Sequence, residues 1–214
     1  MPLSWSSRTR MADKPFAAAA ARNAAPILDI LRRELRDCRE VLEIGSGTGQ
    51  HAATFAAELS HLQWQTSDLD ENHPGIHAWV DDAQLDNLHA PLSLDVRTAR
   101  PEAVSLDAVF SANTAHIMGI DAVEAMFSLV GAVLRPGGVF CLYGPFRLQG
   151  TLNTASNEQF DAGLRSRGEG MGIRDLETLD AFGVRSGLVR RRLYAVPSNN
   201  YVAIWERRAT DDGA

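Results

Sequence analysis

The sequence is poor in cysteine, in long apolar runs and in excess basic charge. Cys38 and Cys141 are too few for a disulfide framework, and nothing around them has the spacing of zinc ligands. No apolar run approaches the ~20 residues that a membrane-spanning helix requires. The formal net charge of −6 argues against long-range attraction to nucleic acid. These absences predict a protein of the reducing cytoplasm whose partner is neither a membrane nor a nucleic acid.

Residue clusters that would bind a polyanion or a metal ion are also scarce. Arg190–Arg192 is a run of three basic residues, but it lies in a predicted strand and is typical of solvated side chains at a sheet edge. His73 and His77 share one face of a predicted helix, and no third ligand accompanies them. The sequence therefore predicts no metal site.

What is present is the composition of one soluble domain. Hydrophobic residues make up 45% of the 214 residues and charged residues 22%. We expect a single domain over residues 13–207. Residues 1–12 lack a periodic apolar face and residues 208–214 follow the last predicted strand, so we expect both to be flexible.

Helix-like and strand-like segments alternate along this domain. The predicted helices cover residues 26–37, 50–59, 73–80, 121–134, 157–166 and 175–182. The predicted strands cover residues 41–44, 63–67, 91–94, 106–112, 139–143, 188–196 and 201–207. Arg135–Gly138, with one proline and two glycines, is expected to end the fourth helix. The alternation predicts an α/β fold with a doubly wound, mostly parallel seven-stranded sheet that ends in an antiparallel hairpin strand.

A glycine-rich turn lies between the first predicted strand and its helix. The segment reads Glu43-Ile44-Gly45-Ser46-Gly47-Thr48-Gly49. Alternate glycines let a ligand lie against bare main chain, and the following helix start offers unpaired N–H groups to it. The dinucleotide fingerprint G-x-G-x-x-G would require a glycine at position 50, where this chain has Gln50.

This turn resembles motif I of the class I S-adenosylmethionine (SAM) methyltransferases. Leu134–Val139 also resembles the segment that precedes the fifth strand in that superfamily. Further segments resemble a small family of methyltransferase-like proteins long labelled as a domain of unknown function. These segments are Ala21–Asn23, Gly49–His51, Asn113–His116 and Met171–Asp175. The resemblance implies that SAM is the cofactor and that the loop holds its amino-acid end, with Glu43 supporting either the loop or the ligand's ammonium group.

The resemblance also places the rest of SAM. Asp68 ends the second predicted strand, where an acid accepts hydrogen bonds from a ribose, although Asp70 and Glu71 are near alternatives. Asp95 follows the third strand and is expected at the adenine amine, with the N–H of Val96 at a ring nitrogen. An Asx turn is the alternative role of Asp95. Asn113, after the fourth strand, is expected near the methyl donor or as a turn cap.

His116 is the best candidate for a general base, because it follows the fourth strand at the ligand-binding edge and titrates near neutrality. Packing at a helix start is its alternative role. Tyr143, at the end of the fifth strand, is a weaker candidate. Other polar residues are expected to close the pocket as a lid or to contact substrate, with plain surface or capping roles as alternatives. These residues are Arg22, Asn23, His51, Arg174 and Asp175.

These features together predict a SAM-dependent methyltransferase that acts on a small molecule. Two alternatives remain at the level of the sequence: an NAD-dependent oxidoreductase and a SAM-binding regulatory module without catalysis. Residues 1–25 and 144–175 lie outside the predicted sheet and are expected to select the acceptor.

Overall fold

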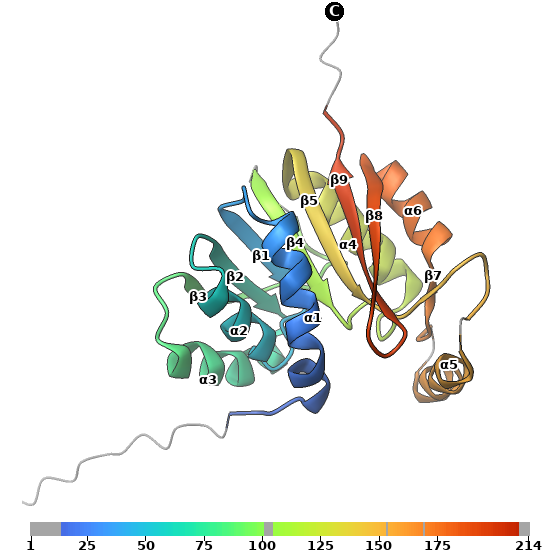
Figure 1. The fold of residues 1–214 in the computed structure, drawn as a ribbon, viewed down its shortest axis with the longest axis horizontal. Coiled ribbons are helices and arrows are strands. Elements are labelled where there is room, and N and C mark those ends of the chain that lie inside the picture. Colours follow the sequence, from blue (N-terminus) through green and yellow to red (C-terminus); the bar gives the residue numbers. More distant parts are fainter. Residues whose placement is uncertain (1–13, 101–104, 153, 169, 210–214) are drawn as a thin grey trace, which may run out of the picture.

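One seven-stranded sheet organises the chain in the computed structural model, which describes residues 14–100, 105–152, 154–168 and 170–209 (Figure 1). The strands of this sheet are β1 (Glu40–Ile44), β2 (Gln63–Asp68), β3 (Leu88–Ser93), β4 (Leu106–Ala112), β5 (Leu134–Gly144), β8 (Leu188–Val196) and β9 (Asn200–Arg207). Their order is β3-β2-β1-β4-β5-β9-β8. Strands β1 to β5 pair in parallel, whereas β9 is antiparallel to both β5 and β8. The predicted fold class is confirmed.

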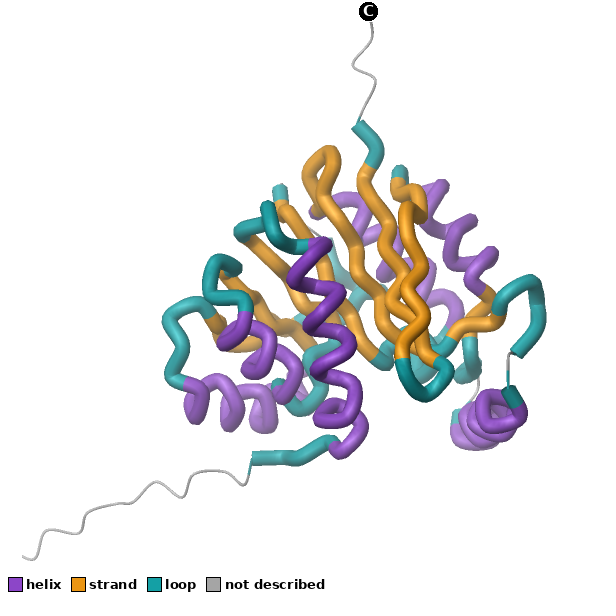
Figure 2. The backbone as a smooth tube through the Cα atoms, in the orientation of Figure 1, coloured by secondary structure: helices purple, strands orange, loops and turns teal. Residues whose placement is uncertain are grey.

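Helices cover both faces of the sheet (Figure 2). The helices are α1 (Ala18–Glu34), α2 (Gln50–Glu58), α3 (His73–Ala83), α4 (Ile120–Val133), α5 (Ala155–Arg167) and α6 (Leu176–Arg185), with one 3-10 turn, η1 (Asp70–Asn72). One face packs on α1 and α2 around Phe55, Trp64 and Phe110. The other packs on α4 and α6 around Phe127 and Trp205. These two apolar layers hold the carboxyl ends of β1 to β5 along one edge, at the bottom of Figure 1.

An additional element lies at that edge. Helix α5 is set apart from the sheet, and two short strands, β6 (Phe146–Arg147) and β7 (Arg174–Asp175), pair in parallel beside it. The helix was expected from the sequence, but this two-stranded sheet was not. Two residues per strand carry no detectable alternation.

Helix α1 begins at Ala18, so the alanine run is helical and continuous with the helix predicted from residue 26, and Pro26 lies inside α1 rather than at its first turn. Alanine has the highest helix propensity of any residue type, so the alanine run extends the helix toward the N-terminus. Pro26 removes one backbone hydrogen bond, and burial of Ile27 and Leu31 on the same helix compensates for that loss.

The fifth strand also begins earlier than predicted. Arg135–Gly138 does not form a turn between helix and strand but a bulge inside β5, because Leu106 pairs with Leu134 and Ala108 already pairs with Val139. Arg135 Nε donates to Asp107 Oδ1 at 2.5 Å across this bulge. Strand β3 likewise begins at Leu88 and includes a proline, which its position at the sheet edge permits.

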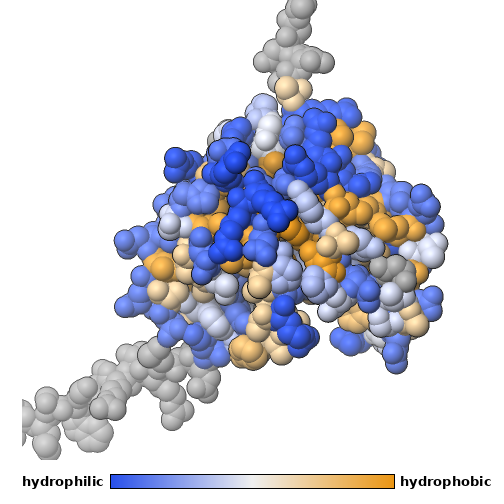
Figure 3. Space-filling view, in the orientation of Figure 1, coloured by the Kyte–Doolittle hydropathy of each residue, from blue (hydrophilic) through white to orange (hydrophobic). Residues whose placement is uncertain are grey.

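The three consecutive arginines of β8 are all engaged in ion pairs. Arg190 pairs with Asp180, Arg191 with Glu206, and Arg192 with Glu34. Hydrophilic side chains cover much of this face of the molecule (Figure 3). β8 is an edge strand of the sheet, as predicted, and carboxylates in addition pair with all three arginines.

The predicted flexible segments fall largely outside the described residues. Residues 1–12 do so entirely, and of residues 208–214 only Arg208 and Ala209 are described. The N–H of Arg208 donates to Gly187 O at 2.9 Å. Among the helices that the structure describes, none combines the length and apolarity needed to span a bilayer. In the same part of the chain, no three His, Cys, Asp or Glu side chains are grouped to hold a metal ion.

Candidate functional site

The glycine loop between β1 and α2 is bound to β2 on one side and open on the other. The N–H groups of Gly45 and Ser46 both donate to Ser67 O at 3.0 Å, which ties the loop to β2. Gly47 has φ +59°, and a Cβ built on it would meet no atom within 4 Å. A side chain would therefore be strained there and would fill the open space above the main chain. The loop presents bare backbone to a ligand at Gly47.

Glu43 supports this loop from inside the protein. It is 1% exposed, and its Oε2 accepts hydrogen bonds from Ser46 Oγ at 2.9 Å and from Trp64 Nε1 at 3.2 Å. Burial raises the pKa of Glu43 to about 7, against the opposing effect of these two donors. Of the two roles expected for Glu43, the geometry favours support of the loop over contact with a ligand.

Asp68 ends β2 beside the loop, and its carboxylate already has three donors. Oδ2 accepts the N–H of Gly47 at 2.7 Å, whereas Oδ1 accepts the N–H of Leu69 at 2.7 Å and Nδ2 of Asn72 at 2.8 Å. A carboxylate offers about four acceptor positions. One position on Oδ2 therefore remains for a ligand, so Asp68 can accept one ribose hydroxyl directly rather than two.

The residues expected at the adenine lie next to Asp68. The N–H of Leu94 donates to Asp68 O at 2.9 Å, which sets β3 and the following turn against the end of β2. Asp95 Oδ1 accepts the N–H of Arg97 at 2.9 Å, so the Asx turn is formed, and Val96 is half-buried. Leu69, which follows Asp68, was not among the predicted site residues. It is 42% exposed although apolar, and its position after a strand-ending acid was the available signal.

Helices α1 and α2 bring three predicted residues together at the end of β5. His51 Nε2 lies 2.6 Å from Asn23 Oδ1, and the His51 ring stacks on Phe55 at 5.1 Å. Burial lowers the pKa of His51 to about 4. Burial also raises the pKa of Tyr143, which a hydrogen bond with Asn23 and the charge of Arg22 oppose. His51 therefore packs as a neutral ring, and Asn23 links it to Tyr143.

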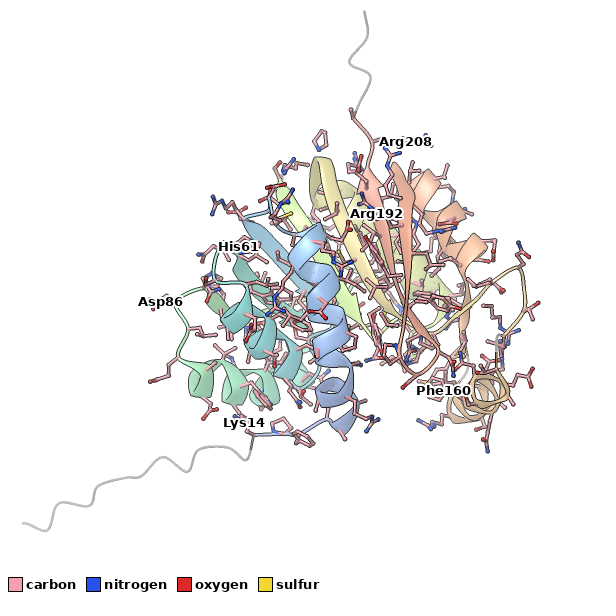
Figure 4. The ribbon with its side chains drawn as sticks, viewed as in Figure 1. Lys14, His61, Asp86, Phe160, Arg192 and Arg208 are labelled. Atoms are coloured by element: carbon pink, nitrogen blue, oxygen red, sulfur yellow. The ribbon has the colours of Figure 1, made fainter. Side chains whose placement is uncertain are left out.

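The segment before α1 crosses the ends of α2 and α3 like a strap, which we define as residues 14–17. Trp79 Nε1 donates to Pro15 O at 2.7 Å, and the N–H of Ala17 donates to Gln50 Oε1 at 3.0 Å. Lys14, which is labelled in Figure 4, lies over the Trp79 ring and pairs with Asp82. The strap thus lies against the helix that follows the glycine loop, and the side chain of Gln50 is one of its attachment points.

The loop after β4 carries His116. Asn113 begins it with φ +61°, a left-handed conformation that asparagine tolerates, and donates its N–H to Tyr143 O at 3.0 Å. His116 is 6% exposed and packs edge-on against Phe160 of α5 at 5.4 Å. Burial, then the charge of Arg174, lowers the pKa of His116 to about 4. The ring is therefore neutral near pH 7, and its nitrogens have no hydrogen-bond partner among the described residues.

Arg174, a predicted lid or substrate residue, is bound to three main-chain carbonyls. Its Nε donates to Ala115 O at 2.8 Å, and its Nη2 donates to Met118 O and Gly170 O. It thereby fastens the loop that carries His116. Asp175 occupies the N-cap position of α6 without making a side-chain cap bond, and its Oδ1 is buried without a partner in the described part of the chain.

Comparisons with known proteins agree with this fold. Residues 14–207 match the family model described as "Protein of unknown function (DUF938)". An O-methyltransferase family protein from Burkholderia thailandensis is similar in structure, with a TM-score of 0.77 and 15% identity over 91% of this chain and 58% of that one. Mitomycin 7-O-methyltransferase has a TM-score of 0.77 at 16% identity over 90% and 55%. Human N-acetylserotonin methyltransferase in complex with SAM has a TM-score of 0.75 at 10% identity over 89% and 53%.

The chain thus spans somewhat more than half the length of these three solved structures. At 10% to 16% identity, the likeness shows a common fold, that of the SAM-dependent methyltransferases.

Proposed function

Because this chain belongs to the DUF938 family and has the methyltransferase fold, we propose that it is a SAM-dependent methyltransferase that acts on a small molecule. The observation that carries the proposal is the pairing of an open glycine loop with an acid at the neighbouring strand end. Gly47 leaves its outer side free, and its N–H is bound by Asp68. A ligand with a polar chain and a ribose has complementary partners at these two points.

The residues of the site fit SAM part by part. The bare backbone at Gly47 and the first N–H groups of α2 suit the amino-acid end. The remaining acceptor position of Asp68 suits a ribose hydroxyl. Exposed Leu69 offers an apolar surface to the adenine ring, beside the turn formed by Asp95 and Val96.

Bound SAM supplies a methyl group already activated by the positive sulfonium. The protein must align the acceptor with it, and positioning of this kind contributes roughly 7–11 kcal/mol in favourable cases. His116 is the group that would take the acceptor's proton, because its ring is neutral near pH 7. A base with a pKa of about 4 has limited driving force, so it suits an acceptor whose proton is already acidic.

A SAM-binding module without catalysis is a second candidate function. It is favoured by the absence of any hydrogen-bond partner that would orient the His116 ring among the described residues. A nicotinamide-dependent oxidoreductase has less support. The third glycine of its fingerprint is replaced by Gln50, whose side chain holds the N–H of Ala17.

Calorimetry of the full chain with SAM and with S-adenosylhomocysteine tests the proposal. We expect both to bind, and absence of binding by folded protein rejects SAM dependence. Methyl transfer to any member of a metabolite panel eliminates the non-catalytic module. Thermal stabilisation by NAD but not by SAM would instead support the oxidoreductase.

A further inference from the structure

A cavity of about 380 Å³ lies beside Arg174, which binds the loop that carries His116. It is lined by Ile120, Arg165, Gly168, Gly170, Met171 and Arg174. Its walls therefore combine two arginines with two apolar side chains. No residue in this cavity has a role in the binding of SAM as described above.

Arg174 has no carboxylate partner among the described residues, and Arg165 shares its partner, Asp161, with Arg147. Arg165 Nε donates to Asp161 Oδ2 at 2.8 Å, but Arg147 shares that oxygen, and Asp161 Oδ1 is taken by the N–H of Ile173 at 2.6 Å. Arg174 donates only to main-chain carbonyls, and no carboxylate forms an ion pair with it among the described residues. Among the described residues that line it, the cavity has two cationic side chains and no anionic one.

The surroundings of Arg174 disfavour its charged form. Burial, and then the charge of Arg165, lowers the pKa of Arg174. Both guanidinium groups keep N–H donors that no described residue accepts, since Arg165 uses Nε alone and Arg174 uses Nε and Nη2. A planar guanidinium with free donors matches the geometry of a carboxylate or a phosphate, and an anion between the two would relieve their repulsion.

The position of the cavity connects it with the candidate base. Thr114 contacts the glycine loop, because a Cβ on Gly45 would lie 2.5 Å from Thr114 Cγ2. Four residues further on, Met118 O accepts from Arg174. The loop that carries His116 therefore contacts the glycine loop through Thr114 and Arg174 through Met118. Phe160, which packs on His116, is 37% exposed and is labelled on α5 in Figure 4.

We propose that Arg165 and Arg174 bind the anionic group of the methyl acceptor, a carboxylate or a phosphate, while Ile120 and Met171 contact its apolar part. The acceptor class is then a small amphiphilic anion. The identification of this anion as an acceptor rests on the proposed methyltransferase function, but anion binding in the cavity does not.

The test titrates full-length protein with inorganic phosphate and, separately, with benzoate, at an ionic strength held constant with sodium chloride. Amide shifts of Gly170 and Gly172 report on the cavity, and the melting temperature reports on the whole protein. We expect saturable shifts in wild type and at least about tenfold weaker binding in Arg165→Gln, the equivalent of losing a charged hydrogen bond. Arg167→Gln is the matched control, with the same charge change two residues along α5 and outside the cavity lining. Equal binding in wild type and Arg165→Gln would overturn the proposal.

Two further arms sharpen the result. The probe that saturates at the lower concentration distinguishes a phosphate site from a carboxylate site. Glu169 lies in sequence between Gly168 and Gly170 and is outside the described residues, so Glu169→Gln is titrated as well. If phosphate binds Glu169→Gln but not wild type, the chain's own carboxylate takes the place assigned to the ligand, and the proposal fails.

Binding of SAM to Arg165→Gln is measured in parallel. Unchanged SAM affinity with lost anion binding supports the cavity and leaves the proposed function in place. Anion binding without any SAM binding in wild type would reject the methyltransferase and keep only the anion site. With SAM binding established, turnover of hydroxybenzoates in preference to the matched neutral hydroxybenzamides is the expected result. The reverse preference would contradict the assignment of the anion as an acceptor.

Discussion

Asp68 Oδ2 accepts the backbone N–H of Gly47 at 2.7 Å, and this bond joins the end of β2 to the loop that follows β1. The same carboxylate is the proposed partner of the ribose. Asp68 therefore has two connected tasks, to hold the loop and to meet the ligand. Substitutions on either side of this bond are the most direct tests of the site.

The first prediction concerns Gly47→Val. The β-branched side chain would fill the open space above the loop and strain a backbone at φ +59°, so SAM affinity should fall by at least about a hundredfold. Calorimetry measures the affinity and circular dichroism the melting temperature. Gly150→Val is the matched control, because Gly150 has φ +72° and is equally open but lies in another loop. Comparable SAM affinity in the two variants would remove Gly47 from the site.

The second prediction concerns Asp68→Ala. The variant loses the acceptor of the Gly47 N–H together with the ribose partner, and charge-assisted bonds contribute about 1.5–3 kcal/mol. SAM affinity should fall roughly ten- to a hundredfold. Asp70→Ala serves as the control, since the Asp70 side chain is 80% exposed. A larger loss of SAM affinity in Asp70→Ala than in Asp68→Ala would indicate that Asp70 binds the ribose.

The third prediction concerns pH and Glu43. The pKa of this buried carboxyl is raised from 4.5 to about 7, so the folded protein keeps its proton at pH values where the unfolded chain has lost it. Stability should therefore decline as pH rises from about 4.5 to about 7, by on the order of 3 kcal/mol from this group.

Glu43→Gln removes the titrating group while keeping its shape and an acceptor for Trp64 Nε1. The difference between wild-type and variant unfolding free energies, from urea titrations across this pH window, should change by that amount. A pH-independent difference would show that the pKa of Glu43 is the same in the folded and unfolded protein.

The fourth prediction concerns His116. If His116 is the base, His116→Gln should lower kcat by about 10²- to 10⁴-fold with SAM affinity unchanged. Because the pKa of His116 is lowered to about 4, the pH profile of wild-type kcat/KM should show no inflection near pH 6.5. It should decline as the pH falls, with a midpoint near pH 4. An unchanged kcat in His116→Gln would leave the ring with a packing role against Phe160.

The fifth prediction concerns the N-terminal segment. Residues 14–25 are packed on α2 and α3 through Pro15, Ala17 and Asn23, and we predict that bound SAM further protects them as a lid. Deleting residues 1–10 should leave SAM affinity intact, whereas deletion through Asn23 should weaken it. Hydrogen exchange with and without S-adenosylhomocysteine gives the direct readout. If residues 14–25 are equally protected with and without S-adenosylhomocysteine, and the longer deletion binds SAM normally, the segment has a packing role only.

Features that depend on residues close together in the sequence could be predicted from it. The strands and helices follow from the periodicity of apolar residues, and β4 was predicted at the bounds observed, Leu106–Ala112. The glycine turn is also local, because glycine adopts the positive φ found at Gly47 without steric cost. Boundaries were wrong where two local signals competed, as at Pro26, where the alanine run prevailed over the proline.

The order of segments along the chain was enough to predict the doubly wound sheet, the glycine loop and the place of Asp68 at a strand end. The packed fold was needed to show that Glu43 supports the loop, that Asp68 keeps one acceptor position for a ligand, and that Arg174 fastens the His116 loop. The reason is separation along the chain. Asn23 and His51 are 28 residues apart and Arg174 and Ala115 are 59 apart, so these side chains meet only when the sheet and its helices have packed.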